Sequence, residues 1–332
     1  FTMLTQKRDA MYIDFFPYYL LSISRANGGY MFFRESKGQT LHRTLENIAS
    51  AGVSGTKARF IKQILAKAAC ETLANLCNLL NKKEPIFSLQ KDRKYRNHKE
   101  EVCRLTEFNN QDKSIKKIIQ PDMAPNYLKY MYKTLKIIKK RQQLSGNEWF
   151  DVLNGGKHII THLESAPHYI SHGDTHLENL VNIEVNFNNE PELAKVGIVD
   201  FGHAKLVTAS YDLAILLEQD GFGFNYEDKN ELIGHYARLL KEKGIVRAIN
   251  TEEYDYNAVY VCILGANTFS SGKMEQKYTQ EECLGKAVWY YSNACEALDR
   301  IMTRTPETMD PLKPLYSVLQ TECQKLEETG HL

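Results

Sequence analysis

Two short polar runs carry the residue types that phosphoryl transfer requires. The first is HGDTHLEN at residues 172–179, and the second is DFG at residues 200–202, which begins 21 residues after Asn179. Transfer to an alcohol needs a carboxylate that orients the hydroxyl and accepts its proton, and oxygen ligands for the metal that neutralises phosphate charge. Asp174 suits the first role, and Asn179 and Asp200 suit the second. The pattern therefore favours a catalytic base at Asp174 and a Mg²⁺ site at Asn179 and Asp200.

Apolar segments flank these runs and indicate how they are positioned. Residues 196–199 form an apolar segment, so we expect a strand that presents the Asp200 carboxylate at a sheet edge. The turn-like NNEP separates two β-branched segments near 180–187 and 194–199, which predicts a hairpin. A second hairpin is predicted from residues 18–25 and 30–35, because the glycines of the intervening Asn27-Gly28-Gly29 tolerate the positive φ of a tight turn.

Most of the remaining chain shows helical periodicity. Residues 3–16 predict a short helix that ends at Pro17, and residues 82–117 are polar and basic, as in a long surface insertion. Asp212 precedes an apolar run and is predicted to be a helix N-cap. The further predicted helices are 57–80, 127–141, 211–220, 228–243, 252–268, 276–303 and 311–328.

The two polar runs, followed by YDLA at residues 211–214, resemble the family of aminoglycoside phosphotransferases and choline kinases. In that family a HGDxHxxN catalytic loop and an IDFG metal loop occur in this order, and the resemblance covers about residues 17–80 and 165–245. It implies an α+β, kinase-like bilobal fold that uses ATP and Mg²⁺. The small N-lobe β-sheet and its hinge would occupy residues 1–36, and the large, mostly helical C-lobe would occupy residues 37–332.

The resemblance also implies roles for further residues. His172 would belong to the catalytic loop and order it through hydrogen bonds. Backbone groups at Phe33, Arg34 and Glu35 would meet the adenine of ATP. For His176, contact with phosphate or substrate and a structural hydrogen bond are both open.

The upstream part of the chain departs from the family pattern. Family members carry a glycine-rich phosphate loop and a strand lysine before the hinge, but no glycine precedes Gly28, and Lys7 is the only early lysine. Three interpretations stay open: a fragment or an omitted flexible lobe, a remodelled lobe that holds the phosphates with other groups, or a degenerate kinase that binds without catalysis. The intact Asp174, Asn179 and Asp200 argue against the last.

An acidic region follows YDLA, where this family builds its acceptor pocket. Carboxylates there would suit a cationic amine through charge-assisted hydrogen bonds, although helix N-termini are commonly acidic in any protein. We therefore predict ATP- and Mg²⁺-dependent transfer of the γ-phosphoryl group to a hydroxyl of a small molecule, such as an aminoglycoside, choline or a sugar. The predicted substrate-binding residues are Glu218, Asp220 and His176.

Basic residues leave other functions open. The helix at 127–141 carries five lysines and Arg141 outside its apolar positions, which predicts either a solvated face or a patch for an acidic partner or an anionic membrane. With the basic insertion, it would suit a kinase-like enzyme acting on a protein or a phospholipid. A non-catalytic binding module with a kinase-like fold is a third hypothesis.

Composition narrows the class of protein. The 332 residues are 43% hydrophobic and 25% charged, which is typical of a globular chain rather than a disordered one. The net charge is +1, so overall charge indicates neither nucleic acid nor a membrane as a partner. The seven cysteines contain no Cys-x-x-Cys pair, which argues against a disulfide scaffold or a structural zinc site. With neither a signal peptide nor an apolar run of roughly 20 residues, we expect a cytoplasmic protein.

Overall fold

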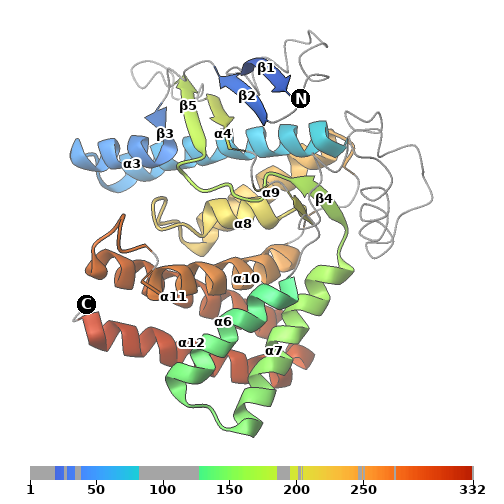
Figure 1. Cartoon of the computed structure of the whole chain (residues 1–332), viewed down its shortest axis with the longest axis vertical. Coiled ribbons are helices and arrows are strands. Elements are labelled where there is room, and N and C mark those ends of the chain that lie inside the picture. Colours follow the sequence, from blue (N-terminus) through green and yellow to red (C-terminus); the bar gives the residue numbers. More distant parts are fainter. Residues whose placement is uncertain are drawn as a thin grey trace. The chain divides into compact units, whose positions relative to one another are not determined.

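The fold is mostly helical with small antiparallel sheets, as an α+β assignment predicts (Figure 1). The predicted helix at 3–16, the predicted adenine contacts Arg34 and Glu35, and the insertion at 82–117 lie outside the described residues. The computed structural model describes residues 19–25, 28–33, 39–81, 127–184, 195–200, 203, 205–245, 249, 251–272 and 274–330.

Both predicted hairpins are confirmed. Strands β1 (Tyr19–Arg25) and β2 (Gly28–Phe33) pair antiparallel, and β2 begins two residues earlier than expected. Strands β5 (Leu180–Glu184) and β6 (Lys195–Ile198) also pair antiparallel. The short β3 (Gln39–Thr40) adds to the other side of β5 and completes a three-stranded sheet in the order β3-β5-β6.

The chain divides into two compact units. Unit 1 comprises residues 1–94, 170–204 and 221–248, and unit 2 comprises residues 95–169, 205–220 and 249–332. The predicted boundary between residues 36 and 37 does not coincide with this division and stays a prediction.

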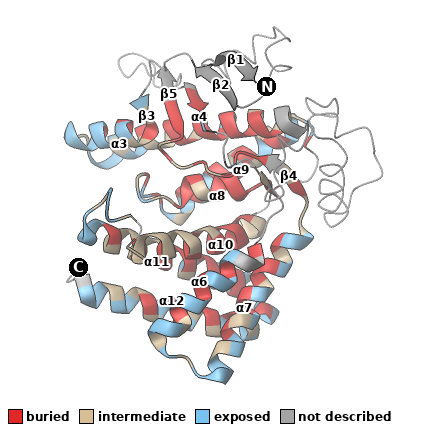
Figure 2. Cartoon of the chain, viewed as in Figure 1, coloured by how far each residue is buried: buried red, intermediate tan, exposed pale blue. Residues whose placement is uncertain are grey.

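Unit 1 is organised around α4 (Gly55–Asn81), which confirms the helix predicted at 57–80. Leu65, Leu73 and Leu76 repeat at helical spacing and are almost fully buried, so α4 contributes one apolar face to the core (Figure 2). This helix packs against α9 (Tyr226–Glu242) and against β6, and α3 (Leu41–Ser50) packs against β5. The sheet edge that follows β6 is therefore held by helices of the same unit.

Unit 2 is a helical assembly centred on α10 (Thr251–Ser270). Every residue from Tyr254 to Tyr260 is buried, as expected for a helix covered on all sides. Helix α11 (Gln280–Arg304) packs against α10 and α12 (Met309–Gly330), as Figure 1 shows. Unit 2 also contains α6 (Tyr127–Gln142), α7 (Gly146–Ser165), α8 (Tyr211–Leu217) and β7 (Lys205–Thr208), and the boundary between the units falls within β4 (His168–Ser171).

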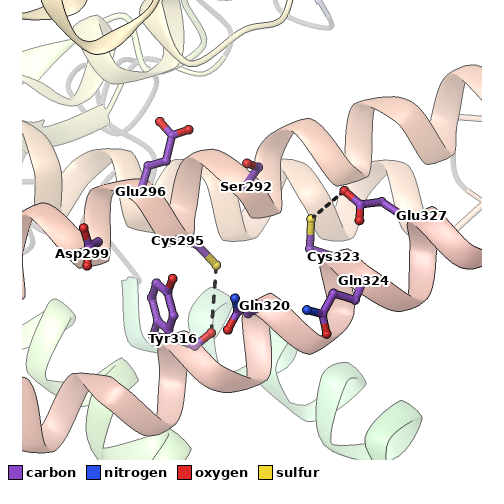
Figure 3. A pocket seen from close by; sticks show the side chains of 9 residues that line it. All are labelled: Ser292, Cys295, Glu296, Asp299, Tyr316, Gln320, Cys323, Gln324 and Glu327. Atoms are coloured by element: carbon purple, nitrogen blue, oxygen red, sulfur yellow. Dashed lines mark hydrogen bonds between the residues drawn. The ribbon is translucent and has the colours of Figure 1, made fainter. Parts of the chain in front are cut away.

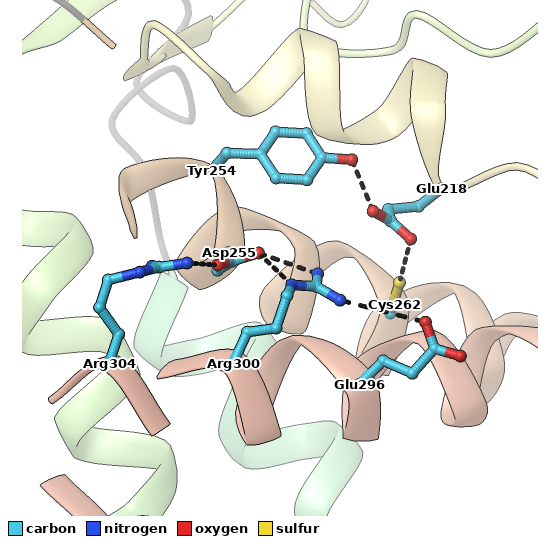
Figure 4. A network of polar contacts seen from close by, with 7 residues as sticks. All are labelled: Glu218, Tyr254, Asp255, Cys262, Glu296, Arg300 and Arg304. Carbon is cyan, nitrogen blue, oxygen red and sulfur yellow. Dashed lines mark hydrogen bonds and ion pairs between the residues drawn. The ribbon is translucent and has the colours of Figure 1, made fainter. Parts of the chain in front are cut away.

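A buried ion network fixes α10 to α11 (Figure 4). The carboxylate of Asp255 has no exposed surface and accepts hydrogen bonds from Arg300 Nε at 3.0 Å, Arg300 Nη2 at 2.8 Å and Arg304 Nη2 at 2.9 Å. Burial raises the pKa of the Asp255 carboxyl, and the two guanidinium groups oppose that rise. Because both oxygens are occupied, the charge of Asp255 is compensated within unit 2.

Some elements differ from the sequence-based expectations. No separate helix was predicted at 146–165, although Ser145 and Glu148 form a capping box in which Ser145 N–H donates to Glu148 Oε2 at 2.8 Å. The predicted N-cap at Asp212 is wrong, because α8 begins at Tyr211 after Ser210 and Asp212 lies buried in the first helical turn.

In the part of the chain that the structure describes, no helix combines the length and the apolarity needed to cross a bilayer.

The pair Gly155-Gly156 permits close packing of α7. A Cβ atom at Gly155 would lie 2.7 Å from the carbonyl oxygen of Pro311 and 2.9 Å from Cβ of Leu315, both in α12. We expect Gly155→Ala to destabilise the protein by about 1–3 kcal/mol, because overpacking outweighs the better helix propensity of alanine. At Gly234 in α9 an added Cβ would meet nothing within 4 Å. Gly234→Ala should therefore stabilise by about 0.5–1 kcal/mol, and equal effects of the two variants in urea unfolding would contradict this account.

Candidate functional site

Antiparallel pairing brings the two polar runs of unit 1 to one sheet edge. Leu180, the first residue of β5, pairs with Ile198, the last residue of β6. The residues that precede β5 and follow β6 therefore leave the sheet side by side. The N–H of Val199 donates to the carbonyl oxygen of Asn179 at 2.9 Å, which continues the pairing by one step. Asn179 is therefore hydrogen-bonded to Val199, the residue that immediately precedes Asp200.

His172 joins the start of the loop to the same edge. Its side chain is fully buried, Nε2 lies 2.8 Å from the carbonyl oxygen of Val199, and Nδ1 accepts from the N–H of Asp174 at 3.3 Å. Since Nδ1 accepts, Nε2 carries the proton and donates to Val199. His172 therefore positions Asp174 relative to the end of β6. Gly173 has φ of 83°, a conformation that favours glycine.

Asp174 and Asn179 are in direct contact. The Asn179 side-chain nitrogen donates to the Asp174 carbonyl oxygen at 2.8 Å and approaches Asp174 Oδ2 at 3.4 Å. Asn179 is almost fully buried, whereas about a third of the Asp174 side chain is exposed: 33%. The carboxylate is therefore oriented by buried groups but accessible to a ligand from solvent.

His176 lies beside this carboxylate. Its Nε2 is 3.6 Å from Asp174 Oδ2, which allows an ion pair when the imidazole is protonated. Its Nδ1 accepts from the N–H of Glu178 at 3.3 Å, so a structural hydrogen bond is present. The contact with phosphate or substrate stays a prediction.

Asp200 adopts a left-handed backbone conformation with φ of 61° and is exposed. Such conformations are uncommon for residues other than glycine, although aspartate tolerates them better than most. This left-handed residue follows β6 after a single intervening residue, Val199. Phe201 and Gly202, the rest of the predicted DFG turn, lie outside the described residues.

Two contacts that sequence analysis did not predict hold this edge from the helices of unit 1. The N–H of His42 in α3 donates to the Leu177 carbonyl oxygen at 3.2 Å, and the hydroxyl of Thr72 in α4 donates to the Val196 carbonyl oxygen. Both are long-range contacts to backbone atoms, and no local sequence signal identifies either acceptor. The spacing of Thr72 on the buried face of α4 was the available indication that it points into the core.

Side-chain oxygens at this sheet edge are of the kind that binds Mg²⁺. The nitrogen of the Asn179 amide is bonded to Asp174, and its oxygen makes no hydrogen bond among the described residues. Within those same ranges, no three His, Cys, Asp or Glu side chains converge as a metal cluster. Mg²⁺ is commonly bound by one or two protein carboxylates together with water and substrate phosphates. An amide oxygen at Asn179 and a carboxylate at Asp200 fit such an ion.

The predicted substrate residues of unit 2 are engaged by protein groups. Glu218 is 1% exposed, and its carboxylate accepts from the hydroxyl of Tyr254 at 2.5 Å and lies 3.8 Å from the sulfur of Cys262 (Figure 4). Burial and this carboxylate raise the pKa of Tyr254, so the phenol stays protonated. Asp220 is more exposed and pairs with Lys286. Their predicted roles toward an acceptor stay predictions.

A pocket of about 370 Å³ lies elsewhere in unit 2, between α11 and α12 (Figure 3). Its lining includes Cys295 and Cys323 but none of the predicted site residues. Burial raises the pKa of Cys295 to about 12 and that of Cys323 to about 11. Both shifts favour the protonated thiol, which is the less nucleophilic form.

Comparisons with known proteins leave the family open. The sequence matches no protein-family model and no curated protein. Among solved structures, a choline/ethanolamine kinase family protein from Mesorhizobium loti aligns with 91% of this chain and 80% of its own, at 12% identity and a TM-score of 0.43. Similarity at this level carries no argument about function.

Proposed function

We propose that this chain is a kinase-like phosphotransferase that moves the γ-phosphoryl group of ATP to a hydroxyl of a small molecule. The observation that supports this proposal most directly is the meeting of Asp174, Asn179 and the Asp200 turn at one edge of the β3-β5-β6 sheet. A carboxylate accessible to solvent stands beside an amide oxygen that is open to a cation, which is the combination that phosphoryl transfer needs.

In the proposed reaction, Asp174 orients the acceptor and takes its proton. The acceptor oxygen forms a bond to the γ-phosphorus as the bond to the bridging oxygen breaks, and ADP departs with that oxygen. His172 and Asn179 hold the main chain of Asp174 so that its carboxylate keeps one orientation. His176 is placed to contact the acceptor or a phosphate oxygen next to Asp174.

Asn179 and Asp200 would hold Mg²⁺ together with the nucleotide phosphates. The ion, when bound, neutralises charge that develops on those phosphates. The exposed position of Asp200 suits contact with a group that arrives with the nucleotide. Backbone groups near Phe33, Arg34 and Glu35 are the proposed adenine contacts.

The chemical class of the acceptor is tested by product formation. The chain is incubated with ATP and Mg²⁺ and, in separate reactions, with choline, ethanolamine, an aminoglycoside or a neutral sugar, and phosphorylated product is detected by mass spectrometry. We expect product with at least one of these acceptors, since each carries a hydroxyl that the accessible Asp174 carboxylate could orient and deprotonate. Nucleotide binding without product from any acceptor would favour a non-catalytic binding module instead.

A further inference from the structure

Exposed apolar side chains are concentrated on one part of unit 2. Six large hydrophobic side chains are exposed among the described residues, and four of them belong to α6 and the start of α7. These four are Tyr130 (50% exposed), Tyr132 (44%), Ile137 (36%) and Phe150 (63%). Single exposed apolar residues need no explanation, but several on neighbouring turns of one hairpin indicate a contact surface.

Exposed lysines lie among these side chains. Lys133, Lys136 and Lys140 follow the i, i+3, i+7 spacing of one helix stripe, opposite the buried Met131 and Ile138. Helix α6 contains no Asp or Glu, and none of the three ammonium groups has an ion-pair partner within the described part of the chain. Arg141 differs, because its guanidinium lies 3.3 Å from Glu322 and donates to the Ser270 carbonyl oxygen at 2.8 Å.

The aromatic residues connect α6 to α7. The ring centroids of Tyr132 and Trp149 are 6.0 Å apart, and Lys139 Nζ lies 5.1 Å from the Trp149 ring centroid. The exposed side of α6 therefore continues across Trp149 onto α7. We call this surface the basic–aromatic face, defined by Tyr132, Lys133, Lys136, Lys140, Trp149 and Phe150.

We propose that the basic–aromatic face binds the surface of a membrane that contains anionic lipids. Lysines at a membrane surface are attracted by anionic headgroups. Each lysine adds its own contribution to the binding free energy, and no complementary pocket is required. Tyrosine, tryptophan and phenylalanine place their rings at the level of the headgroups, where one side is apolar and the other is hydrated. Three lysines beside aromatic rings on an exposed helix face can contact such a membrane surface, and the protein needs no groove for this contact.

Two other acidic partners fit the face less well. Protein–protein interfaces are depleted of lysine, whereas this face is built on it. Recognition of nucleic acid relies strongly on arginine, and the only arginine of α6 is bound to Glu322 and Ser270. Anionic lipid is therefore the occupant that the residue types favour.

Vesicle flotation tests this proposal with the full chain. Phosphatidylcholine vesicles with and without phosphatidylserine are compared at low and high salt. We expect binding only when phosphatidylserine is present, and weaker binding as salt screens the charges. The variant K133Q/K136Q/K140Q should bind roughly 100-fold more weakly, and Phe150→Ser should bind roughly tenfold more weakly.

A matched control removes the same charge elsewhere. The variant K241Q/K313Q/K325Q replaces three other exposed lysines and should bind anionic vesicles as the unmodified chain does. Circular dichroism confirms that each variant is folded. Equal loss in both triple variants, equal binding to neutral vesicles, or binding to polyglutamate or RNA but not to vesicles would overturn the proposal. Because the readout is lipid binding, the result is independent of the proposed phosphotransfer.

Discussion

Replacing Asp174 with asparagine is expected to reduce kcat by roughly 10³-fold, within the range that general bases contribute, while changing the dissociation constant of ATP by less than about twofold. Asparagine preserves the shape of the side chain but cannot accept the hydroxyl proton. The contacts of Asp174 with His172 and Asn179 involve mainly its backbone atoms, so the loop should keep its conformation. Steady-state turnover and ATP titration are measured on the same preparation.

The matched control is Asp151→Asn, which makes the same chemical change at an exposed position of α7. It should leave both turnover and ATP affinity unchanged. If Asp174→Asn turns over normally, Asp174 is not the base. If it loses ATP binding together with turnover, the residue serves nucleotide binding rather than proton transfer. Either outcome would overturn the assigned role.

Replacing Asp255 with alanine is expected to destabilise unit 2 by about 3–5 kcal/mol, because it leaves the largely buried guanidinium group of Arg300 without its counter-charge. The side chain of Asp255 is 0% exposed, that of Arg300 is 16% exposed, and their shortest contact is 2.8 Å. Both tryptophans of the chain, Trp149 and Trp289, belong to unit 2. Their fluorescence during urea unfolding therefore reports on the unit that contains the network.

Glu296 provides the control for this prediction. It approaches the same Arg300 at 4.0 Å, but its side chain is 59% exposed (Figure 4). Solvent screens this contact, so Glu296→Ala should change stability by about 0–1 kcal/mol. Similar losses for Glu296→Ala and Asp255→Ala would contradict the view that burial gives the Asp255 contacts their importance.

The elements that sequence analysis predicted well are those with local signals. Helix α4 shows apolar residues at helical spacing over its whole length, and the β5–β6 hairpin has β-branched segments around a polar turn. That hairpin was enough to predict that Asp200 would emerge at a sheet edge. The contact between Asp174 and Asn179 followed from the same short loop, because five residues separate them in sequence.

What could not be predicted depends on contacts between distant residues or on competing local signals. Asp255 and Arg300 are 45 positions apart, and nothing near either residue identifies its partner. Helix α7 has a capping box at Ser145, but Gly155 and Gly156 weaken its helical pattern, since their function is close packing against α12 and α6. Asp212 resembled an N-cap because aspartate suits both the N-cap position and the first turn of a helix.

The most direct test of the central claim is calorimetric titration of ATP into the chain with and without Mg²⁺, beside the Asp200→Gly variant. Glycine removes the carboxylate and accommodates the φ of 61° at this position, so the backbone turn is preserved. We predict that the chain binds ATP in a Mg²⁺-dependent manner and that Asp200→Gly loses this dependence. ATP binding that is equally strong with and without Mg²⁺, or unchanged in the variant, would contradict the assignment of the β5–β6 edge as a nucleotide–metal site.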